Sequence, residues 1–355
     1  YERICKNFRL IFISHSSILG IATGGKTMQD MVRVVVDAMG GDNAPHEIIK
    51  GAVEAVGKSD AIHVILVGKE DVINQELSGY TYNKEQISVV HTSEVIETAE
   101  PPVMAIRRKK DSSIVVGLKM VKDKEADAFV SAGSSGAVLA GGQLLVGRIK
   151  GVERPPLAPL IPTEKGFSIL IDCGANADCK PSYLQQFAVM GSAYMKGVMG
   201  LESPRVGLLN NGAEAEKGNE LTKAAYPLIQ AAPVNFAGNC EARDILSGNY
   251  DVLVCDGFSG NVVLKYTEGL SATILAMLKE ELMADPRAKL GALLAKPAFR
   301  RMKKKMDYTE HGGAPLLGVN GGVIKAHGSS DARAFKNAIR QAKSCVERDV
   351  SGAIE

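Results

Sequence analysis

Short apolar runs, each followed by a polar, glycine-containing loop and then by helix-like sequence, recur along the chain. The first run, Val34–Val36, ends at Asp37, and a Gly40–Gly41 turn leads to a helix that opens near Pro45. Runs of the same kind lie at 128–130, 167–171, 206–209, 234–236 and 252–255. Strands that alternate with helices predict a largely parallel sheet with both faces covered. Polar loops at successive strand ends predict a crevice along that edge.

Further elements follow from the same patterns. Strands are expected at 62–68, 87–91 and 322–326, and helices at 48–56, from residue 69, at 101–110 and from Asp331 to about Arg348. Ser329 or Ser330 is expected to cap the last of these helices.

The stretch at 261–307 has a different pattern and predicts a protruding helical arm. Val262 to Met283 has apolar residues at helical spacing, and Asp285–Pro286 is typical of an N-cap followed by a first-turn proline. A second helix, ending near Met306, is amphipathic and rich in Lys and Arg. Such a helix either packs in a subunit interface or lies on an anionic membrane surface, and a dimer could do both.

Composition and charge narrow the possible classes. The 355 residues are 45% hydrophobic, only 5% aromatic and include 37 glycines, which suits a βα-layered protein with many tight turns. A nucleic-acid binder that stacks bases needs more aromatic side chains, so no nucleic-acid partner is expected. The net charge of +2 implies no global electrostatic preference.

Residues 1–30 are interpreted as an extension outside the fold. Within them, Gly20–Thr27 matches the P-loop pattern, but a true P-loop needs a helix opening at its Lys-Thr. The strand at Val32 begins too soon to leave room for that helix. Residues 31–355 are therefore expected to form a single α/β catalytic domain.

The sequence also argues against several cofactors. The dinucleotide pattern GxGxxG does not occur in the chain, nor do a CxxC pair, a zinc spacing or an HExxH pattern. No cofactor and no metal are expected, and the six cysteines are typical of reduced cytosolic thiols.

The best candidate for an anion cradle is the loop that follows the strand at 128–130. Its hydroxyl groups and the amides of the following helix would face one point. The residues expected to position phosphate are Ser131, Gly133, Ser134, Ser135 and Gly136.

From Met31 onward the chain resembles the PlsX phosphate acyltransferases of bacterial phospholipid synthesis. The resemblance rests on motifs in the family's order: 36–42, 131–133, 172–176, 217–220, Gly238–Asn239 with Glu241 and Asp244, 256–261, 312–318 and 325–328. The family usually has Asn-Thr where this chain has Ser134–Ser135. The resemblance implies a fold similar to the isocitrate/isopropylmalate dehydrogenases and phosphotransacetylases, and a homodimer.

The resemblance also implies the reaction: acyl-[acyl carrier protein] and inorganic phosphate give acyl phosphate and free carrier protein. It implies a cytoplasmic protein held peripherally on the inner face of the cell membrane. The acyl phosphate would feed a downstream glycerol-3-phosphate acyltransferase. The alternatives are a related phosphate acetyl- or butyryltransferase acting on acyl-CoA, and a catalytically silent membrane scaffold.

In this reaction phosphate is itself the nucleophile, so the protein has to position it and stabilise an oxyanion. Lys325 or His327 could supply positive charge or protonate the leaving thiolate, and Asp256 could orient one of them. Neutral donors for a carbonyl oxygen are Asn176, Asn210, Asn239 and Asn261. Lys217, Gly40, Gly41 and Asp37 complete the expected substrate-binding set, with Asp37 expected mainly to brace its own turn.

Two further hypotheses concern cysteines and basic runs. Cys173, Cys240 or Cys255 could act as an acyl acceptor, although cysteines at strand ends are more often buried and inert. The acidic carrier protein would dock on a basic face, either Arg107–Lys110 or Arg300–Lys305.

Overall fold

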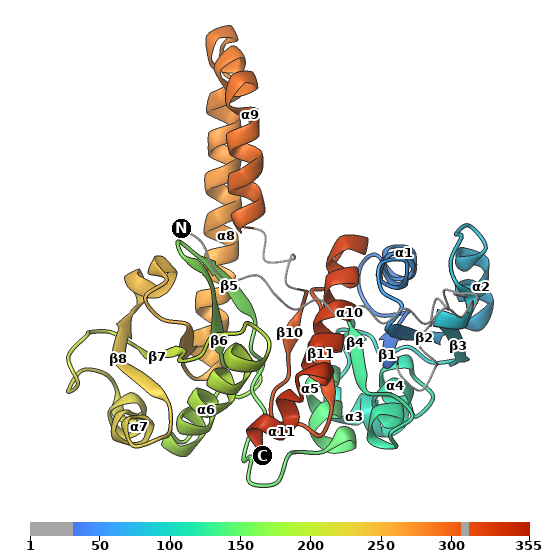
Figure 1. The fold of residues 1–355 in the computed structure, drawn as a ribbon, viewed down its shortest axis with the longest axis horizontal. Helices are drawn as coiled ribbons and strands as arrows, with labels where there is room; N and C mark the ends of the chain where they lie inside the picture. The colour runs from blue at the N-terminus through green and yellow to red at the C-terminus, as the bar shows by residue number, and fades with distance from the viewer. Residues whose placement is uncertain (1–30, 307–311) are drawn as a thin grey trace, which may run out of the picture.

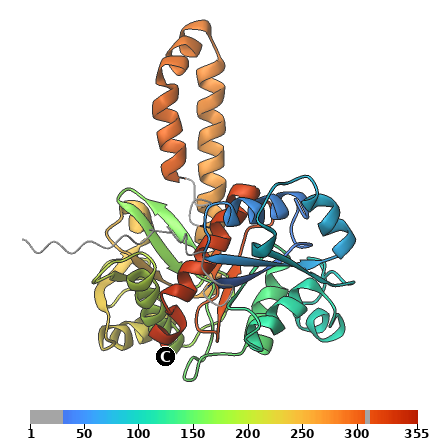
Figure 2. The same cartoon turned by 45° about the vertical axis from the view of Figure 1, so that its right-hand side comes forward.

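The computed structural model describes residues 31–306 and 312–355, apart from the side chains of 303–306. The predictions for residues 1–30, including the P-loop-like stretch, lie outside the described residues. Two βα-layered units lie side by side, and a helical hairpin projects between them (Figures 1 and 2). The sequence predicted strands alternating with helices, and the structure divides those strands between two sheets.

The first sheet has six strands in the order β10-β11-β4-β1-β2-β3. Their bounds are Ala314–Pro315 (β10), Gly322–Lys325 (β11), Ala128–Ser131 (β4), Val32–Asp37 (β1), Ile62–Gly68 (β2) and Ile87–His91 (β3). Neighbouring strands run parallel except β10, which is antiparallel to β11.

Helices cover both faces of this sheet because successive side chains of a strand point to opposite faces. Val34 and Val36 pack in one layer with α1 (His46–Val56) and α10 (Ala332–Glu347), while Val35 packs on the other face with α4 (Ser113–Lys122). The remaining helices of this unit are α2 (Glu70–Leu77), α3 (Pro102–Arg108), α5 (Ser135–Gly141) and α11 (Val350–Ile354).

The second sheet has five strands in the order β5-β6-β9-β7-β8. Their bounds are Leu160–Thr163 (β5), Gly166–Ile171 (β6), Val252–Val254 (β9), Arg205–Asn210 (β7) and Asn235–Glu241 (β8), and only β5 runs antiparallel to its neighbour. This unit contains α6 (Pro181–Gly197) and α7 (Glu220–Gln230), and α6 packs in the apolar cluster on one face of the sheet. The first turns of α8 (Gly257–Met283) pack against the cluster on the other face.

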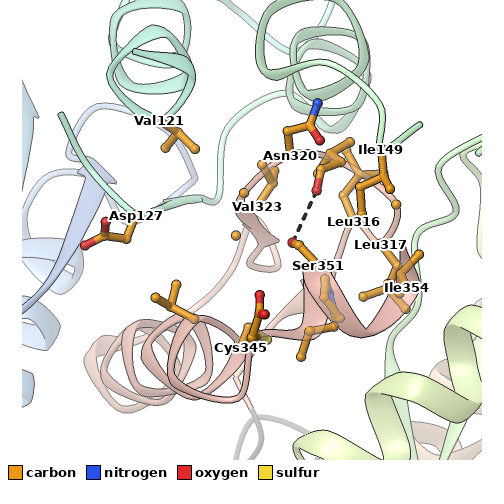
Figure 3. Close-up of a pocket in the computed structure, with 18 of the residues that line it drawn as sticks. Val121, Asp127, Ile149, Leu316, Leu317, Asn320, Val323, Cys345, Ser351 and Ile354 are labelled. Atoms are coloured by element: carbon orange, nitrogen blue, oxygen red, sulfur yellow. Dashed lines mark hydrogen bonds between the residues drawn. The ribbon is translucent and has the colours of Figure 1, made fainter. Parts of the chain in front are cut away.

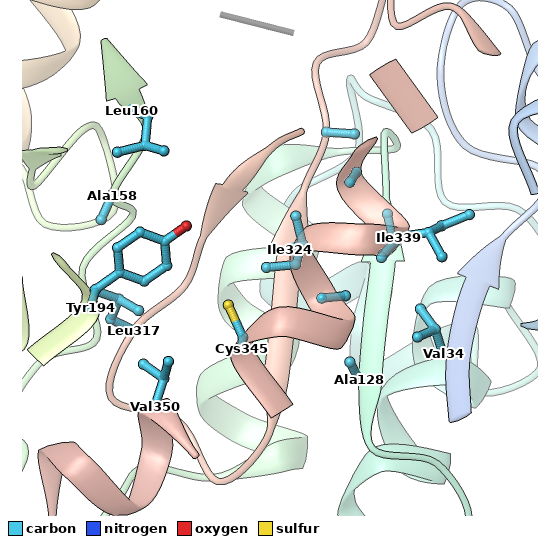
Figure 4. Close-up of a cluster of buried hydrophobic side chains, with 14 of the residues drawn as sticks. Val34, Ala128, Ala158, Leu160, Tyr194, Leu317, Ile324, Ile339, Cys345 and Val350 are labelled. Atoms are coloured by element: carbon cyan, nitrogen blue, oxygen red, sulfur yellow. The ribbon is translucent and has the colours of Figure 1, made fainter. Parts of the chain in front are cut away.

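One continuous apolar cluster joins the two units. It contains Val34 and Ile324 of the first sheet together with Leu160 and Ile171 of the second. Figure 4 shows Tyr194 of α6 on one side of this region and Ile339 of α10 on the other. The Nε2 of Gln341 donates a 2.9 Å hydrogen bond to the hydroxyl of buried Tyr194, so the contact between the units includes a satisfied polar pair.

The arm predicted at 261–307 is present as two antiparallel helices, α8 and α9 (Pro286–Met306), that extend away from both sheets (Figure 1). Oδ1 of Asp285 accepts hydrogen bonds from the amides of Arg287 (2.8 Å) and Ala288 (3.0 Å), which confirms the predicted cap. No helix in the described residues is both long enough and apolar enough to cross a membrane.

Three local predictions are corrected. Asp331, not Ser329 or Ser330, caps α10, because its Oδ1 accepts from the amide of Ala334 at 2.9 Å. Strand β8 continues through Asn239 to Glu241, where a loop was expected, because Gly238 at φ +91° accommodates an irregularity in the β7–β8 register. Asn261 belongs to α8, which begins already at Gly257.

Candidate active site

Asp37, at the carboxyl end of β1, joins two loops of the first sheet. Its fully buried carboxylate accepts hydrogen bonds from the amide of Met39 (3.1 Å) and from Oγ of Ser131 (2.7 Å). Ser131 Oγ in turn accepts from the amide of Gly133 at 3.0 Å. Burial raises the pKa of Asp37, and hydrogen bonds from Ser113 and Ser131 oppose that rise. These contacts are those of a brace, as expected from the sequence.

The glycine turn after Asp37 lets three loops meet closely. A Cβ on Gly40 would lie 2.3 Å from Oδ2 of Asp37 and 2.7 Å from the Cα of Gly133. Gly41 has φ +111°, a conformation that favours glycine. The amide of Asp42 donates to the carbonyl of Gly328 at 2.8 Å, which attaches the loop that follows β11.

Asp172 has the corresponding role in the second sheet. Its Oδ1 accepts from the amides of Leu157 (2.8 Å) and Ala175 (3.3 Å), and its Oδ2 accepts from the amide (2.6 Å) and Nδ2 (3.0 Å) of Asn176. The carbonyl of Asn176 accepts from the amide of Gly257 at 2.8 Å. Asp172 thus ties the loop after β6 to the start of α8. Burial raises the pKa of Asp172 to about 6.

An open cleft of about 790 Å³ lies between the two sets of loops. The first unit contributes α5, residues 312–314 and the loop after β11, and the second contributes β5, the loop after β6 and one face of α8. The polar and small residues that line it are Ser135, Lys325, Ala326, His327, Gly328, Gly174, Asn261, Lys265 and Glu268, among others. The cleft therefore lies at the carboxyl ends of parallel strands, where the sequence placed a crevice.

Lys325 is the most strongly perturbed cation in this cleft. Only 7% of it is exposed, and its Nζ donates to the carbonyl of Ala326. Burial lowers the pKa of Lys325 to about 8; the charges of Asp37 and Asp42 oppose the shift and Lys265 adds to it. An ammonium group with this pKa is well matched to a thiolate, whose ordinary pKa is about 8.5.

His327, Ser135 and Asn261 present polar atoms to the same cleft. His327 is exposed, and its Nδ1 accepts from the amide of Ser329 at 3.2 Å and contacts the Ser329 hydroxyl at 2.8 Å. Because a backbone amide can only donate, the neutral ring carries its proton on Nε2. A Cβ added to Gly174 would reach ordinary contact distance from Asn261, at 3.6 Å, so the loop after β6 lies close to the start of α8.

Other residues of the expected set support the cleft instead of lining it. Ser131 and Ser134 are buried, and Ser134 Oγ accepts from the amide of Ala137, capping α5 at 3.4 Å. Asn176 uses its Nδ2 on Asp172 and on the carbonyl of Pro155 (3.0 Å). The loop glycines Gly40, Gly41 and Gly133 and the helical Gly136 of α5 contribute close packing, and a Cβ on Gly136 would meet Pro102 at 2.4 Å.

Asn210, Lys217 and Asn239 form a separate group, at the carboxyl ends of β7 and β8. Asn210 Nδ2 donates to the carbonyl of Lys217 at 3.1 Å, and Asn239 Nδ2 donates to that of Glu214 at 2.7 Å. These three do not line the cleft that contains Lys325.

Asp256 was expected to orient Lys325 or His327. Both its oxygens instead accept from Ser259, at 2.8 and 2.9 Å, and so cap α8.

Two groups at the cleft were missed from the sequence. Lys265 and Glu268 form a 2.8 Å ion pair on the cleft face of α8, and Asp172 organises the wall behind them. The sequence signal for this ion pair is the i, i+3 spacing of two opposite charges within an otherwise apolar helix. The interpretation of the segment as an arm did not use that spacing.

The cysteines proposed as acyl acceptors are poorly suited to that role. Burial raises the pKa of Cys173 and Cys255 well above the ordinary range and raises that of Cys240 to about 12. Since the thiolate is the nucleophile, these thiols are inert near neutral pH. Among residues 31–306 and 312–355, no cluster of His, Cys, Asp or Glu could hold a metal ion.

A second cavity, of about 430 Å³, lies at the opposite ends of the strands (Figure 3). Asp127 and Gly322 line it where β4 and β11 begin, beside Cys345 of α10 and Ser351 of α11. Ser351 Oγ donates to the carbonyl of Val319 at 3.3 Å across it. Because it lies where strands begin, this cavity is separate from the cleft at the strand ends, where Lys325 and Asp172 lie.

The molecule has an α/β fold of two largely parallel sheets, with a cleft at the carboxyl ends of their strands. The structure resembles the EutD phosphotransacetylase of Staphylococcus aureus and a phosphotransacetylase of Streptococcus pyogenes, each with a TM-score of 0.60, covering 89% of this chain and 94% of the other. At 16% and 15% identity this likeness concerns the fold alone.

Sequence relatives give the family. A family model described as "Fatty acid synthesis protein" matches residues 32–353. The phosphate acyltransferase of Alkaliphilus oremlandii is 56% identical over 90% of this chain and 95% of its own length, and that of Clostridium novyi is 55% identical over 91% and 98%. The chain belongs to this family, the PlsX family, and is a phosphate acyltransferase.

Proposed function

We propose that the protein transfers an acyl group from acyl-[acyl carrier protein] to inorganic phosphate, giving acyl phosphate and free carrier protein for membrane phospholipid synthesis. The observation that carries the proposal is the cleft itself, because one opening has Lys325, His327, Ser135 and Asn261 on its walls. Ammonium and neutral donors in a partly enclosed site suit an anionic nucleophile and a developing oxyanion.

In the proposed reaction a phosphate oxygen attacks the thioester carbonyl carbon, and the carbonyl electrons move onto its oxygen. Collapse of this oxyanion breaks the C–S bond and expels the pantetheine thiolate. Lys325 is the proposed general acid, because its pKa of about 8 lies close to that of the thiol it protonates. Asn261 and the Nε2–H of His327 are the proposed oxyanion donors, and Ser135 the proposed phosphate contact.

The acidic carrier would dock on Arg107 and Arg108 of α3, which are exposed. Lys109 of the same run is already paired with Glu100 at 2.6 Å. Pro102 at the start of α3 packs against Gly136 of α5, next to Ser135 of the cleft, so this helix adjoins the proposed site. The basic run 300–305 lies instead on the arm.

The arm supports the proposals of a homodimer and of peripheral membrane contact on the inner face of the cell membrane. On α8, exposed apolar side chains follow one stripe: Phe258, Val262, Tyr266, Leu270, Ile274 and Met277. A second copy covering this stripe would remove it from water. On α9, exposed Leu290, Leu293 and Leu294 lie among Arg and Lys, the pattern of an interfacial helix.

One assay tests the reaction: the protein, acyl-carrier protein and phosphate are mixed without metal or nucleotide, and free thiol is followed. Phosphate-dependent release supports the proposal. No release from the carrier, together with release from acyl-CoA, would identify the acyl-CoA alternative, and no release from either would leave a silent scaffold. Sedimentation tests the dimer, and flotation with anionic liposomes tests the membrane contact.

A further inference from the structure

A third cavity, of about 450 Å³, lies where the two units meet. It is bounded by the turn between α1 and β2, by the C-terminal part of α6 and by one face of α10. Part of its wall is apolar, with Ile62 and Leu160 both buried. The volume is in the range of sites for small molecules.

The charged side chains that line this cavity are all cations. They are Lys58, Arg340 and Lys343, and among the described residues no carboxylate lines the cavity. Lys343 is paired at 2.6 Å with Glu347, and Glu54, near Lys58, is already paired with a lysine of α10. Lys58 and Arg340 therefore supply most of the positive charge. A cavity lined by one sign of charge beside an apolar wall attracts ligands of the opposite sign, here anions.

A buried hydroxyl group in the same cavity has a proton without an acceptor among the described residues. Tyr194 of α6 is fully buried and lines the cavity (Figure 4). The amide of Gly313 donates to Oε1 of Gln341 at 2.8 Å, which leaves Nε2 of Gln341 to meet the Tyr194 hydroxyl at 2.9 Å. Because Nε2 can only donate, the hydroxyl accepts, and its own proton is left for a ligand with an acceptor oxygen.

We propose that this cavity is a second anion site, separate from the catalytic cleft, and that it binds a small phosphate monoester with an apolar body. Such a group carries close to two negative charges and three strong acceptor oxygens, which suits two cations and a phenol donor. The apolar body lies against Ile62 and Leu160. The site goes beyond the proposed function, because none of its cations lines the cleft of the acyl transfer.

Gln341 connects this site to the catalytic cleft. Its Nε2 contacts Tyr194, while its Oε1 holds the amide of Gly313, a residue that lines the cleft. A Cβ on Gly313 would lie 2.5 Å from the carbonyl oxygen of Lys325, so this loop lies directly on the strand that carries Lys325. A ligand that accepts the Tyr194 proton makes the hydroxyl a better acceptor for Gln341 and so steadies the loop at Gly313.

Isothermal titration calorimetry with phenyl phosphate, inorganic phosphate and phenol tests the site. We expect phenyl phosphate to bind at least about tenfold more tightly than either of the others, because it has both the dianion and the apolar body. Arg340→Gln should weaken this binding at least about tenfold. The matched control is Arg348→Gln, which removes the same charge from an exposed position at the end of α10, outside the cavity, and should change nothing.

Tyr194→Phe tests the buried donor, with Tyr183→Phe of the same helix as its control, since Tyr183 does not line the cavity. The Tyr194 variant should bind phenyl phosphate severalfold more weakly, and the Tyr183 variant should bind it normally. Unchanged affinity in both Arg340→Gln and Tyr194→Phe would place all binding elsewhere, including the catalytic cleft, and would overturn the proposal. So would the absence of binding by the unsubstituted protein, or inorganic phosphate that binds as tightly as the ester.

Hydrogen exchange tests the connection through Gln341. Saturating phenyl phosphate should slow exchange in the segment 312–317 of the unsubstituted protein severalfold, and the same concentration should slow it less in Arg340→Gln. Equal slowing in the two proteins would show that the effect comes from the catalytic cleft and would overturn the connection.

Discussion

Oγ of Ser131 donates a 2.7 Å hydrogen bond to Oδ2 of Asp37, although the two residues are 94 positions apart in the chain. Both side chains are fully buried. The bond fixes the loop after β4 against the loop after β1, and Gly40 and Gly133 pack where the two loops meet. The position of Ser135 in the cleft depends on this junction.

Ser131→Ala should lower the free energy of unfolding by about 1–3 kcal/mol, because a buried carboxylate loses a donor. Urea denaturation measures this loss. Ser135→Ala is the matched control: its exposed hydroxyl supports no fold contact, so stability should hold while the KM for phosphate rises. Equal stability of the Ser131 variant and the unsubstituted protein would show that the brace is dispensable.

Activity should fall as the pH rises through about 8. The pKa of Lys325 is lowered to about 8, so below that pH the amine carries the proton that the thiolate needs, and above it the proton is lost. A pH profile of kcat/KM measures this limb. Lys325→Met should reduce kcat by about 10²–10⁴-fold. Undiminished turnover by that variant would remove Lys325 from the mechanism.

Asp172→Asn should destabilise the protein by about 2–4 kcal/mol, because an amide cannot accept from all four N–H donors around this side chain. The pKa of Asp172 rises from 3.8 to about 6 on folding, so the folded state binds more protons between these values. The contribution of this carboxyl to stability is therefore full below pH 3.8 and declines as the pH rises through 6. Chemical denaturation between pH 4 and 7 should show this slope in the unsubstituted protein and not in Asp172→Asn.

A triple variant with Cys173, Cys240 and Cys255 changed to Ala should keep its phosphate-dependent turnover. The raised pKa values of these buried thiols leave almost no thiolate near pH 7. Small cavities should cost a few kcal/mol of stability in total. Turnover is therefore measured below the melting temperature of the variant. Loss of turnover in a folded sample would support a cysteine as the acyl acceptor.

Charge reversal should separate the two basic faces. Arg107→Glu with Arg108→Glu should raise the KM for the carrier at least about tenfold and reduce its salt dependence, because rim charges steer an acidic partner. Arg300→Glu with Arg301→Glu should leave that KM unchanged and weaken flotation on anionic liposomes. If the Arg300 and Arg301 variant raised the KM for the carrier and the Arg107 and Arg108 variant did not, the carrier would dock on the arm instead.

The sequence by itself determined most of the elements, although the cap of α10, the end of β8 and the start of α8 came from the structure. β-branched runs such as Val34–Val36 specify buried strands, and the Asp285–Pro286 pair specifies a helix start through local backbone chemistry. The polar loops that follow the strands predicted a crevice at the carboxyl ends of the strands, because parallel strands bring those ends to one edge of a sheet. The family resemblance came from motifs spread over nearly the whole chain.

Only the tertiary structure decided which polar residues face the cleft. Asn176 and Asn261 are indistinguishable as sequence letters, but Asn176 uses its donors on Asp172 and Pro155 while Asn261 lines the opening. The strand order of the second sheet, which places Asn210 on β7 and Asn239 on β8, on the other side of β9 from β6, likewise depends on long-range strand pairing. So does the lowered pKa of Lys325, because burial and the charges around it come from segments distant in the chain. Local patterns carry no information about such contacts, since they are set by packing between elements.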